Sequence, residues 1–112
     1  MKLVVFVLKK EELLGDVLTT FKEAGIEDAT IIDSVGMGKV LAYDVPLFAE
    51  LRNMLKETHL YTRTIFAVVE DEIIDELIKL LEDVCGDLSQ PGNGTFFVIP
   101  VEKIKGPGKN RR

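Results

Sequence analysis

The stretch LVVFVL at residues 3–8 decides the fold class, because six consecutive apolar residues that include three valines and a phenylalanine are typical of a strand buried on both faces. The stretch is far too short to cross a membrane, and two lysines and two glutamates follow it at once. It also lacks the small-residue cleavage site of a secretory signal. We therefore expect a cytoplasmic protein whose first element is a buried strand.

Two helices are predicted where the hydrophobic period changes further along the chain. Apolar residues recur at helical spacing in two segments: Leu14, Val17, Leu18, Phe21 and Ala24 over residues 11–24, and Ile74, Leu77, Ile78, Leu81 and Val84 over residues 71–86. Each segment opens with two acidic residues, whose charge favours the positive end of a helix dipole. Gly25 and Gly86 are expected to end the two helices.

Three more strands are predicted at residues 29–35, 64–69 and 95–104. Pro100 restricts the last strand to an edge, an end or a bulge, because proline cannot donate to a strand ladder. The long excursion over residues 39–62 is the least regular part. One face of a short helix is marked there by Leu47, Phe48, Leu51, Met54 and Leu55, and the remainder of the excursion is predicted to be a loop.

The order strand, helix, strand, excursion, strand, helix, strand predicts an α+β fold of ferredoxin-like βαββαβ type. Right-handed crossovers place both helices on one face of a four-stranded antiparallel sheet. We expect one domain over residues 1–105, followed by a basic C-terminal tail at residues 106–112. The other face of the sheet would be a large apolar patch, because the strands show no polar alternation. Either other subunits bury this face, or the middle helix packs over it within one chain.

Composition argues against several classes of function. The net charge of −5 argues against nucleic-acid binding, because phosphate neutralisation needs clustered Lys and Arg. Cys85 is the only cysteine, so an intrachain disulfide is excluded and a buried core residue is expected. His59, the only histidine, falls on a different element, and no residue is placed to orient the pair for catalysis. We therefore do not expect an enzyme.

Two glycine-rich turns are candidate anion sites. One is Gly36-Met37-Gly38 followed by Lys39, and the other is Gly92-Asn93-Gly94. Glycine has no side chain, so backbone N–H groups in such turns can approach a phosphate closely. Lys39 and the basic tail would supply positive charge. The alternative is that these glycines only turn corners.

Taken together, these motifs resemble the PII signalling family over nearly the whole chain. The resemblance is carried by Ala24-Gly25-Ile26 with Ala29-Thr30, by Gly36-Met37-Gly38, by Val69-Glu70-Asp71 through Asp75-Glu76-Leu77-Ile78, and by Gly92-Asn93-Gly94 with Phe96-Phe97-Val98 and Val101-Glu102. In the family pattern the first glycine pair lies at the base of the long T-loop and the second lies in the B-loop.

The resemblance implies a homotrimer that binds ATP, ADP or AMP between its subunits. It also implies a protein target, a membrane transporter or an enzyme, contacted through residues 38–62. It assigns the following residues to the ligand site: Gly36, Met37, Gly38, Lys39, Gly92, Asn93, Gly94, Lys103 and Lys105.

Two positions depart from the family pattern. Val40 stands where the family has a Gln that helps bind magnesium and 2-oxoglutarate, and Thr95 stands where the B-loop has a Lys. Val40 argues against 2-oxoglutarate sensing, and Thr95 removes a charge that would pair with a phosphate. They also keep open an alternative function as an oligomeric assembly module, or as a CutA-like metal-binding module, with no nucleotide.

Overall fold

The computed structural model describes residues 1–53 and 61–106. Its elements in chain order are β1 (Lys2–Leu8), η1 (Glu11–Leu13), α1 (Leu14–Glu23), β2 (Thr30–Val35), α2 (Met37–Asp44), η2 (Pro46–Asn53), β3 (Tyr61–Val69), η4 (Asp71–Ile73), α3 (Ile74–Cys85) and β4 (Thr95–Pro100). The elements labelled η are 3₁₀ helices. Met54, Leu55, His59 and the tail beyond residue 106 lie outside the described residues.

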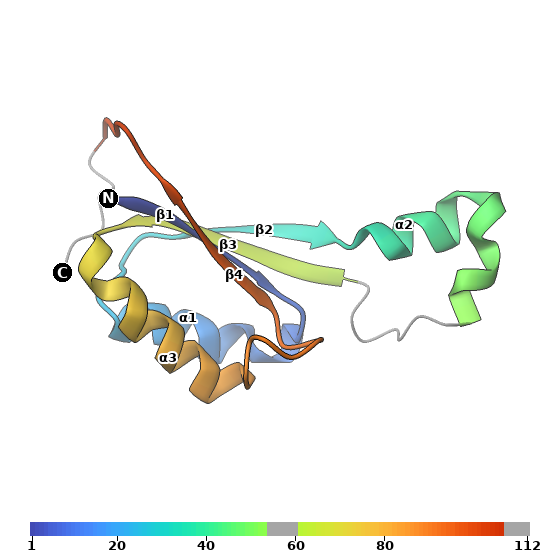
Figure 1. The fold of residues 1–112 in the computed structure, drawn as a ribbon, viewed down its shortest axis with the longest axis horizontal. Coiled ribbons are helices and arrows are strands. Elements are labelled where there is room, and N and C mark those ends of the chain that lie inside the picture. Colours follow the sequence, from blue (N-terminus) through green and yellow to red (C-terminus); the bar gives the residue numbers. More distant parts are fainter. Residues whose placement is uncertain (54–60, 107–112) are drawn as a thin grey trace.

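The four strands form one antiparallel sheet in the order β2-β3-β1-β4. In its middle, Phe6 of β1 lies opposite Ile65 of β3 on one side and Phe96 of β4 on the other. Helices α1 and α3 lie side by side on one face of this sheet (Figure 1). The arrangement confirms the predicted ferredoxin-like α+β fold.

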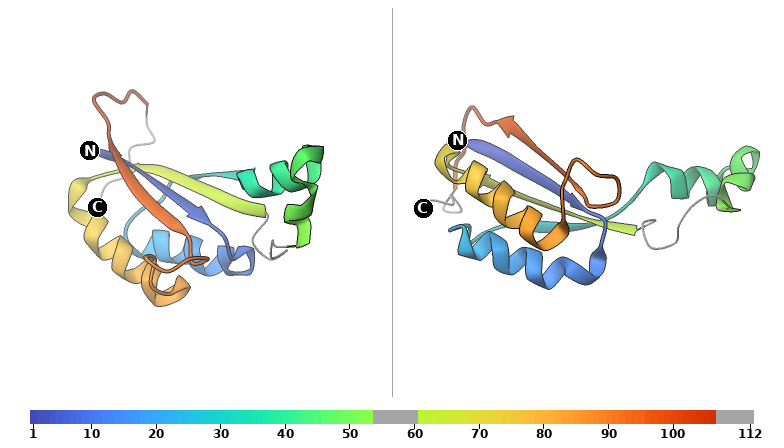
Figure 2. Two further views of the ribbon diagram at one scale, coloured as in Figure 1. Left: turned by 45° about the vertical axis from the view of Figure 1, so that its right-hand side comes forward. Right: turned by 60° about the horizontal axis from the view of Figure 1, so that its bottom comes forward.

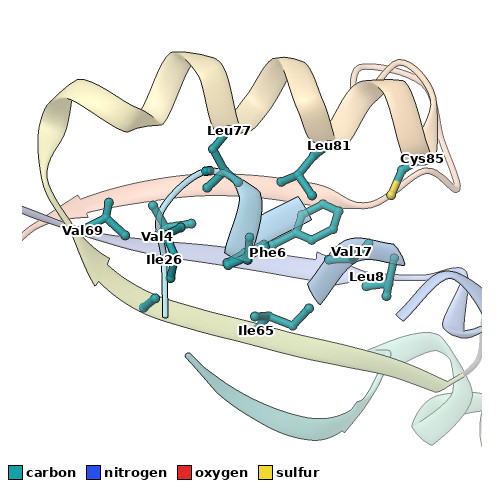
Figure 3. Close-up of a cluster of buried hydrophobic side chains, with 13 residues drawn as sticks. Val4, Phe6, Leu8, Val17, Ile26, Ile65, Val69, Leu77, Leu81 and Cys85 are labelled. Atoms are coloured by element: carbon teal, nitrogen blue, oxygen red, sulfur yellow. The ribbon is translucent and has the colours of Figure 1, made fainter. Parts of the chain in front are cut away.

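The hydrophobic core fills the space between the sheet and the two helices (Figure 3). Its buried members are Val4, Phe6, Leu8, Val17, Phe21, Ala24, Ile26, Ile65, Ala67, Val69, Leu77, Leu81 and Cys85. Cys85 is only 2% exposed, which confirms its prediction as a buried core residue. Its burial also raises the pKa of the thiol, because a thiolate is poorly solvated there.

The opposite face of the sheet, called the open face below, carries no helix in the described part of the chain (Figure 2). The strand register places eight apolar residues on it: Leu3, Val5, Val7, Ile32, Phe66, Val68, Phe97 and Ile99. Ile32, Phe97 and Ile99 remain 46%, 44% and 44% exposed. The predicted apolar patch is therefore present.

Residues 37–53 form a projection, called the arm below, in which α2 and η2 pack against each other. The arm extends beyond the end of the sheet where β2 finishes (Figure 1). It therefore leaves the open face uncovered, and packing of the middle helix over that face within one chain is wrong for the described residues.

The secondary structure of the arm differs from the prediction in two ways. Residues 39–44, predicted to be a loop, belong to α2, which begins directly after Gly36. The predicted single helix after Pro46 is a pair of 3₁₀ turns with a kink at Phe48, whose φ of −108° and ψ of 20° are not helical. Leu47, predicted to lie on the apolar face of that helix, is 84% exposed.

The last strand is shorter than the predicted 95–104, since β4 ends at Pro100. Pro100 lies opposite Lys2 at the end of this edge strand, one of the positions to which its missing N–H restricts it. One backbone hydrogen bond to the first chain segment follows it, from the Val101 N–H to the carbonyl of Met1 at 3.3 Å.

Replacing Asp71 by Asn is expected to lower stability at neutral pH by a small amount. Hydrogen bonds from Lys2 Nζ and from the Met1 amino group, each 2.8 Å long, lower the pKa of Asp71 below its usual 3.8. A carboxyl with a depressed folded pKa stabilises the fold above its unfolded pKa, and this contribution is lost as the pH falls through the folded pKa.

Urea unfolding of the wild type and Asp71→Asn at several pH values checks this expectation. The two free energies of unfolding should differ at pH 7 and converge well below pH 3.8. A constant difference across that range would contradict the ion-pair account.

Candidate functional site

The first glycine turn is the start of helix α2. Gly36 is the N-cap, with an extended backbone (φ −73°, ψ 152°) and no side chain that caps the helix. Its carbonyl accepts bonds from the N–H groups of Lys39 and Val40. The N–H groups of Met37 and Gly38 have no intrahelical acceptor, because the first turn of any helix lacks one. Two backbone donors therefore point out of this helix end, where the dipole favours an anion.

Lys39 connects this helix start to the sheet. Its Nζ lies 5.5 Å from the ring centre of Tyr61, the first residue of β3, and 5.9 Å from that of Tyr43. Both tyrosines are exposed, at 57% and 39%. The lysine charge is thus held by aromatic rings at the base of the arm, close in sequence to the open N–H groups.

A cluster of three hydroxyls lies beside the end of β2. Ser34 Oγ is 2.6 Å from Thr62 Oγ1 and 2.9 Å from Thr64 Oγ1. Three hydroxyl hydrogens serve these two contacts, so at least one hydrogen is left over for another acceptor. These three hydroxyls were not among the candidate site residues predicted from the sequence. The three hydroxyls come together only because Ser34 of β2 pairs with Thr62 of β3. The one local signal in the sequence is the position of Ser34, two residues before Gly36.

An ion-pair group lies at the same end of the sheet. Arg63 contacts Glu11 of η1 through Nη2 at 2.7 Å and Asp33 of β2 through Nε at 3.0 Å. A hollow of about 340 Å³ lies here, lined by Glu11, Asp33, Ser34, Tyr61, Thr62 and Arg63. Two acids surround one guanidinium, so this hollow does not favour a phosphate.

The second glycine turn, Gly92-Asn93-Gly94, is held by hydrogen bonds within its own loop. Asn93 Nδ2 donates a hydrogen bond to the carbonyl of Asp87 at 2.8 Å, so this side chain braces the turn. The Ser89 N–H and hydroxyl both donate to Asp87, which lowers the pKa of that carboxyl. Gly92 and Gly94 have φ values of +89° and +115°, which favour glycine. The turn is thus preformed in the single chain.

The two glycine turns lie at the same end of the sheet. Gly36 follows the end of β2, and Gly94 precedes β4, whose first residue Thr95 lies opposite Val7 near the end of β1. Strands β3 and β1 separate them, which corresponds to about 14 Å across the sheet. One phosphate therefore cannot contact both turns of a single chain.

The two candidate lysines lie at the opposite end. Strand β4 runs away from the glycine turns and ends with Pro100 opposite Lys2, and exposed Lys103 and Lys105 follow it. The structure thus brings Gly36 to Lys39 together as one unit and keeps Gly92 to Gly94 as a second. It does not bring the two lysines to either turn within one chain.

The described residues contain no group of three or more His, Cys, Asp or Glu side chains that could hold a metal ion. His59, the candidate in the metal-binding alternative, lies outside the part of the chain that the structure describes. No helix among residues 1–53 and 61–106 is long and apolar enough to cross a membrane.

The fold and the two glycine turns define the class of the protein as a ferredoxin-like α+β domain with a projecting arm between β2 and β3. The family model of nitrogen regulatory protein P-II matches residues 1–106. The chain therefore belongs to the P-II family, which confirms the resemblance found in the sequence. Proteins of this family are regulatory proteins rather than enzymes. No curated protein sequence matches the chain at a significant level.

The substitution Gly94→Ala is expected to destabilise the fold by about 2–4 kcal/mol, combining left-handed backbone strain with overpacking. A Cβ at Gly94 would lie 2.9 Å from Phe6 Cε1 and 3.1 Å from the Val7 carbonyl oxygen. Gly36→Ala is the matched control, because a Cβ at that extended position meets nothing within 4 Å. Urea unfolding of both variants measures the difference, and equal stability would contradict the packing role of Gly94.

Proposed function

We propose that this P-II family protein is a regulatory protein that binds an adenine nucleotide or a related small anion between the subunits of a homotrimer. The bound state is passed to a protein target through residues 38–62. The observation that carries this proposal is the uncapped start of α2 at Gly36, where two free N–H groups and the helix dipole favour an anion.

The same helix start links ligand and arm. An eight-residue helix is marginal by itself, because nucleation is costly and few hydrogen bonds repay it. An anion at its N-terminus contributes about 0.3–1 kcal/mol, and 1 kcal/mol changes a two-state ratio about fivefold. A ligand bound at Gly36 would therefore shift α2, and with it the arm, toward the helical form. This is the step by which occupancy becomes a signal.

Trimer formation is supported by the open face of the sheet. Ile32, Phe97 and Ile99 are about half exposed there, and covering each would recover roughly 1 kcal/mol of hydrophobic free energy. The separation of the candidate residues also favours a shared site. Lys103 and Lys105 lie at the far end of the sheet from the glycine turns, so only a second copy can bring them there.

An assembly module without a ligand is the second candidate function. Gly94 packs against Phe6, which explains that glycine without any ligand. Thr95 also replaces the lysine that the family pattern uses to pair with phosphate. On this alternative the open face alone determines the role of the chain.

Titration calorimetry with ATP, ADP, AMP and cyclic dinucleotides, together with light scattering, tests the proposal. We expect a trimer that binds one of these ligands. The key variant is Gly36→Asp: its backbone angles suit an aspartate N-cap, whose carboxylate would occupy the free N–H groups of α2. It should keep the fold and weaken nucleotide binding by about tenfold or more, because one carboxylate then repels the ligand.

Gly36→Ala is the control, since it adds no charge and no acceptor and should change the affinity little. Nucleotide binding by Gly36→Asp equal to that of the wild type would place the anion elsewhere. A wild-type trimer that binds none of these ligands would favour the assembly module.

A further inference from the structure

Arg52 of η2 is held in place by the end of α2. Its Nε donates a hydrogen bond of 2.9 Å to the carbonyl of Ala42, and its Nη2 donates a longer one of 3.4 Å to the carbonyl of Tyr43. The guanidinium carbon also lies 4.9 Å from the centre of the Tyr43 ring. These carbonyls belong to the last turn of α2, where the helix dipole favours a cation. The contacts fix the orientation of the guanidinium.

A second cation lies at the same tyrosine ring, since Lys39 Nζ is 5.9 Å from its centre. Within the described residues, neither Lys39 nor Arg52 has a carboxylate oxygen within 4.0 Å, although Asp44 and Glu50 belong to the same arm. Arg63 of the sheet, by contrast, contacts two carboxylates. The arm therefore presents two neighbouring positive charges that form no direct ion pair with a described carboxylate.

Arg52 keeps donors available for a further partner. A guanidinium has five N–H donors, and the two carbonyl contacts use two of them. The side chain is exposed, so the other three can reach an incoming group. A planar guanidinium whose orientation is already fixed suits two parallel hydrogen bonds to a carboxylate, with little further loss of side-chain freedom.

We propose that Arg52, supported by Lys39, is the docking site for an acidic side chain of a partner protein, presented next to an apolar residue that covers Leu47. The proposal rests on the proposed function, because it names the chemistry of the target that contacts residues 38–62.

The surroundings of Arg52 favour a protein over a free anion. The hollow described above is lined by residues around Arg63, not by Arg52. On an open surface an isolated ion pair is weak, because water screens it. Leu47, which belongs to the same element η2 as Arg52, is 84% exposed. A protein surface that covered both side chains would exclude water from the ion pair. An apolar and acidic protein segment thus gains from both features at once.

A phage-displayed library of random 12-residue peptides, selected on the immobilised full chain, tests the proposal. The selected peptides are expected to carry Asp or Glu next to Leu or Phe. Arg52→Gln should weaken their binding by about tenfold, and Arg52→Lys should restore only part of it, because lysine keeps the charge but not the paired donors. Lys79→Gln, which removes one charge from an exposed position of α3, is the control and should leave the affinity unchanged.

Selected peptides without acidic residues, or equal binding to Arg52→Gln and the wild type, would overturn the proposal. Arg52 also satisfies carbonyls of α2, so circular dichroism must show whether its variants keep the helix. Leu47→Gln provides a second test that does not depend on folding, because the exposed leucine supports no core, and it should weaken peptide binding as well.

Two further measurements separate the outcomes. Tight, saturable binding of inorganic phosphate that is lost in Arg52→Gln would mark a small-anion site and overturn docking of a protein. Calorimetry of Arg52→Gln with nucleotides distinguishes the docking proposal from the proposed regulatory function. If the variant still binds nucleotide, and no acidic peptide binds even the wild type, docking at Arg52 is overturned. The proposed regulatory function is then unaffected.

Discussion

Burial of β1 between its two neighbouring strands is the constraint on which the rest of the structure depends. Val4, Phe6 and Leu8 are completely buried under the helices, so the intervening side chains of β1 must face the other way and create the open face. The central position of β1 also determines which segments meet. Both glycine turns lie at the end of the sheet where β1 finishes, and the ring of Phe6 fills the space beside Gly94. The packing of Phe6 in the core therefore depends on the absence of a side chain at Gly94.

Much of the fold could be predicted from the sequence, because the strands and the two long helices have strong and distinct hydrophobic periods. The structure of the arm could not be predicted, because the local sequence at the start of α2 favours a turn and not a helix. Gly36 and Gly38 suggest a turn, and a glycine inside a helix costs about 1 kcal/mol relative to alanine. Contacts distant in sequence offset this cost, among them the hydrogen bond from Arg52 to the Ala42 carbonyl. Such contacts depend on how η2 folds back, which no local pattern specifies.

The candidate site could likewise be predicted only in part from the sequence. The two glycine turns could be found from spacing alone, since glycines at such positions have few other purposes than close backbone approach or a turn. The hydroxyl cluster and the contacts of Arg63 depend on strand register, because Ser34 meets Thr62, and Asp33 meets Arg63, only when β2 and β3 pair as they do. A sequence motif likewise does not specify the direction in which a strand runs in the sheet. The motif therefore could not show that β4 places Lys103 at the end of the sheet opposite the glycine turns.

The direct connection between β2 and α2 has a mechanical consequence. Gly36 is the only residue between Val35, which ends β2, and Met37, which begins α2, so on the β2 side a single residue joins the sheet to the arm. The eight residues of α2 span about 12 Å, and a rotation of about 10° at this joint would move its far end by about 2 Å. A small rotation of α2 about Gly36 is therefore amplified at the far end of the helix. A rotation too small to alter the sheet would be large enough there to make or break a van der Waals contact.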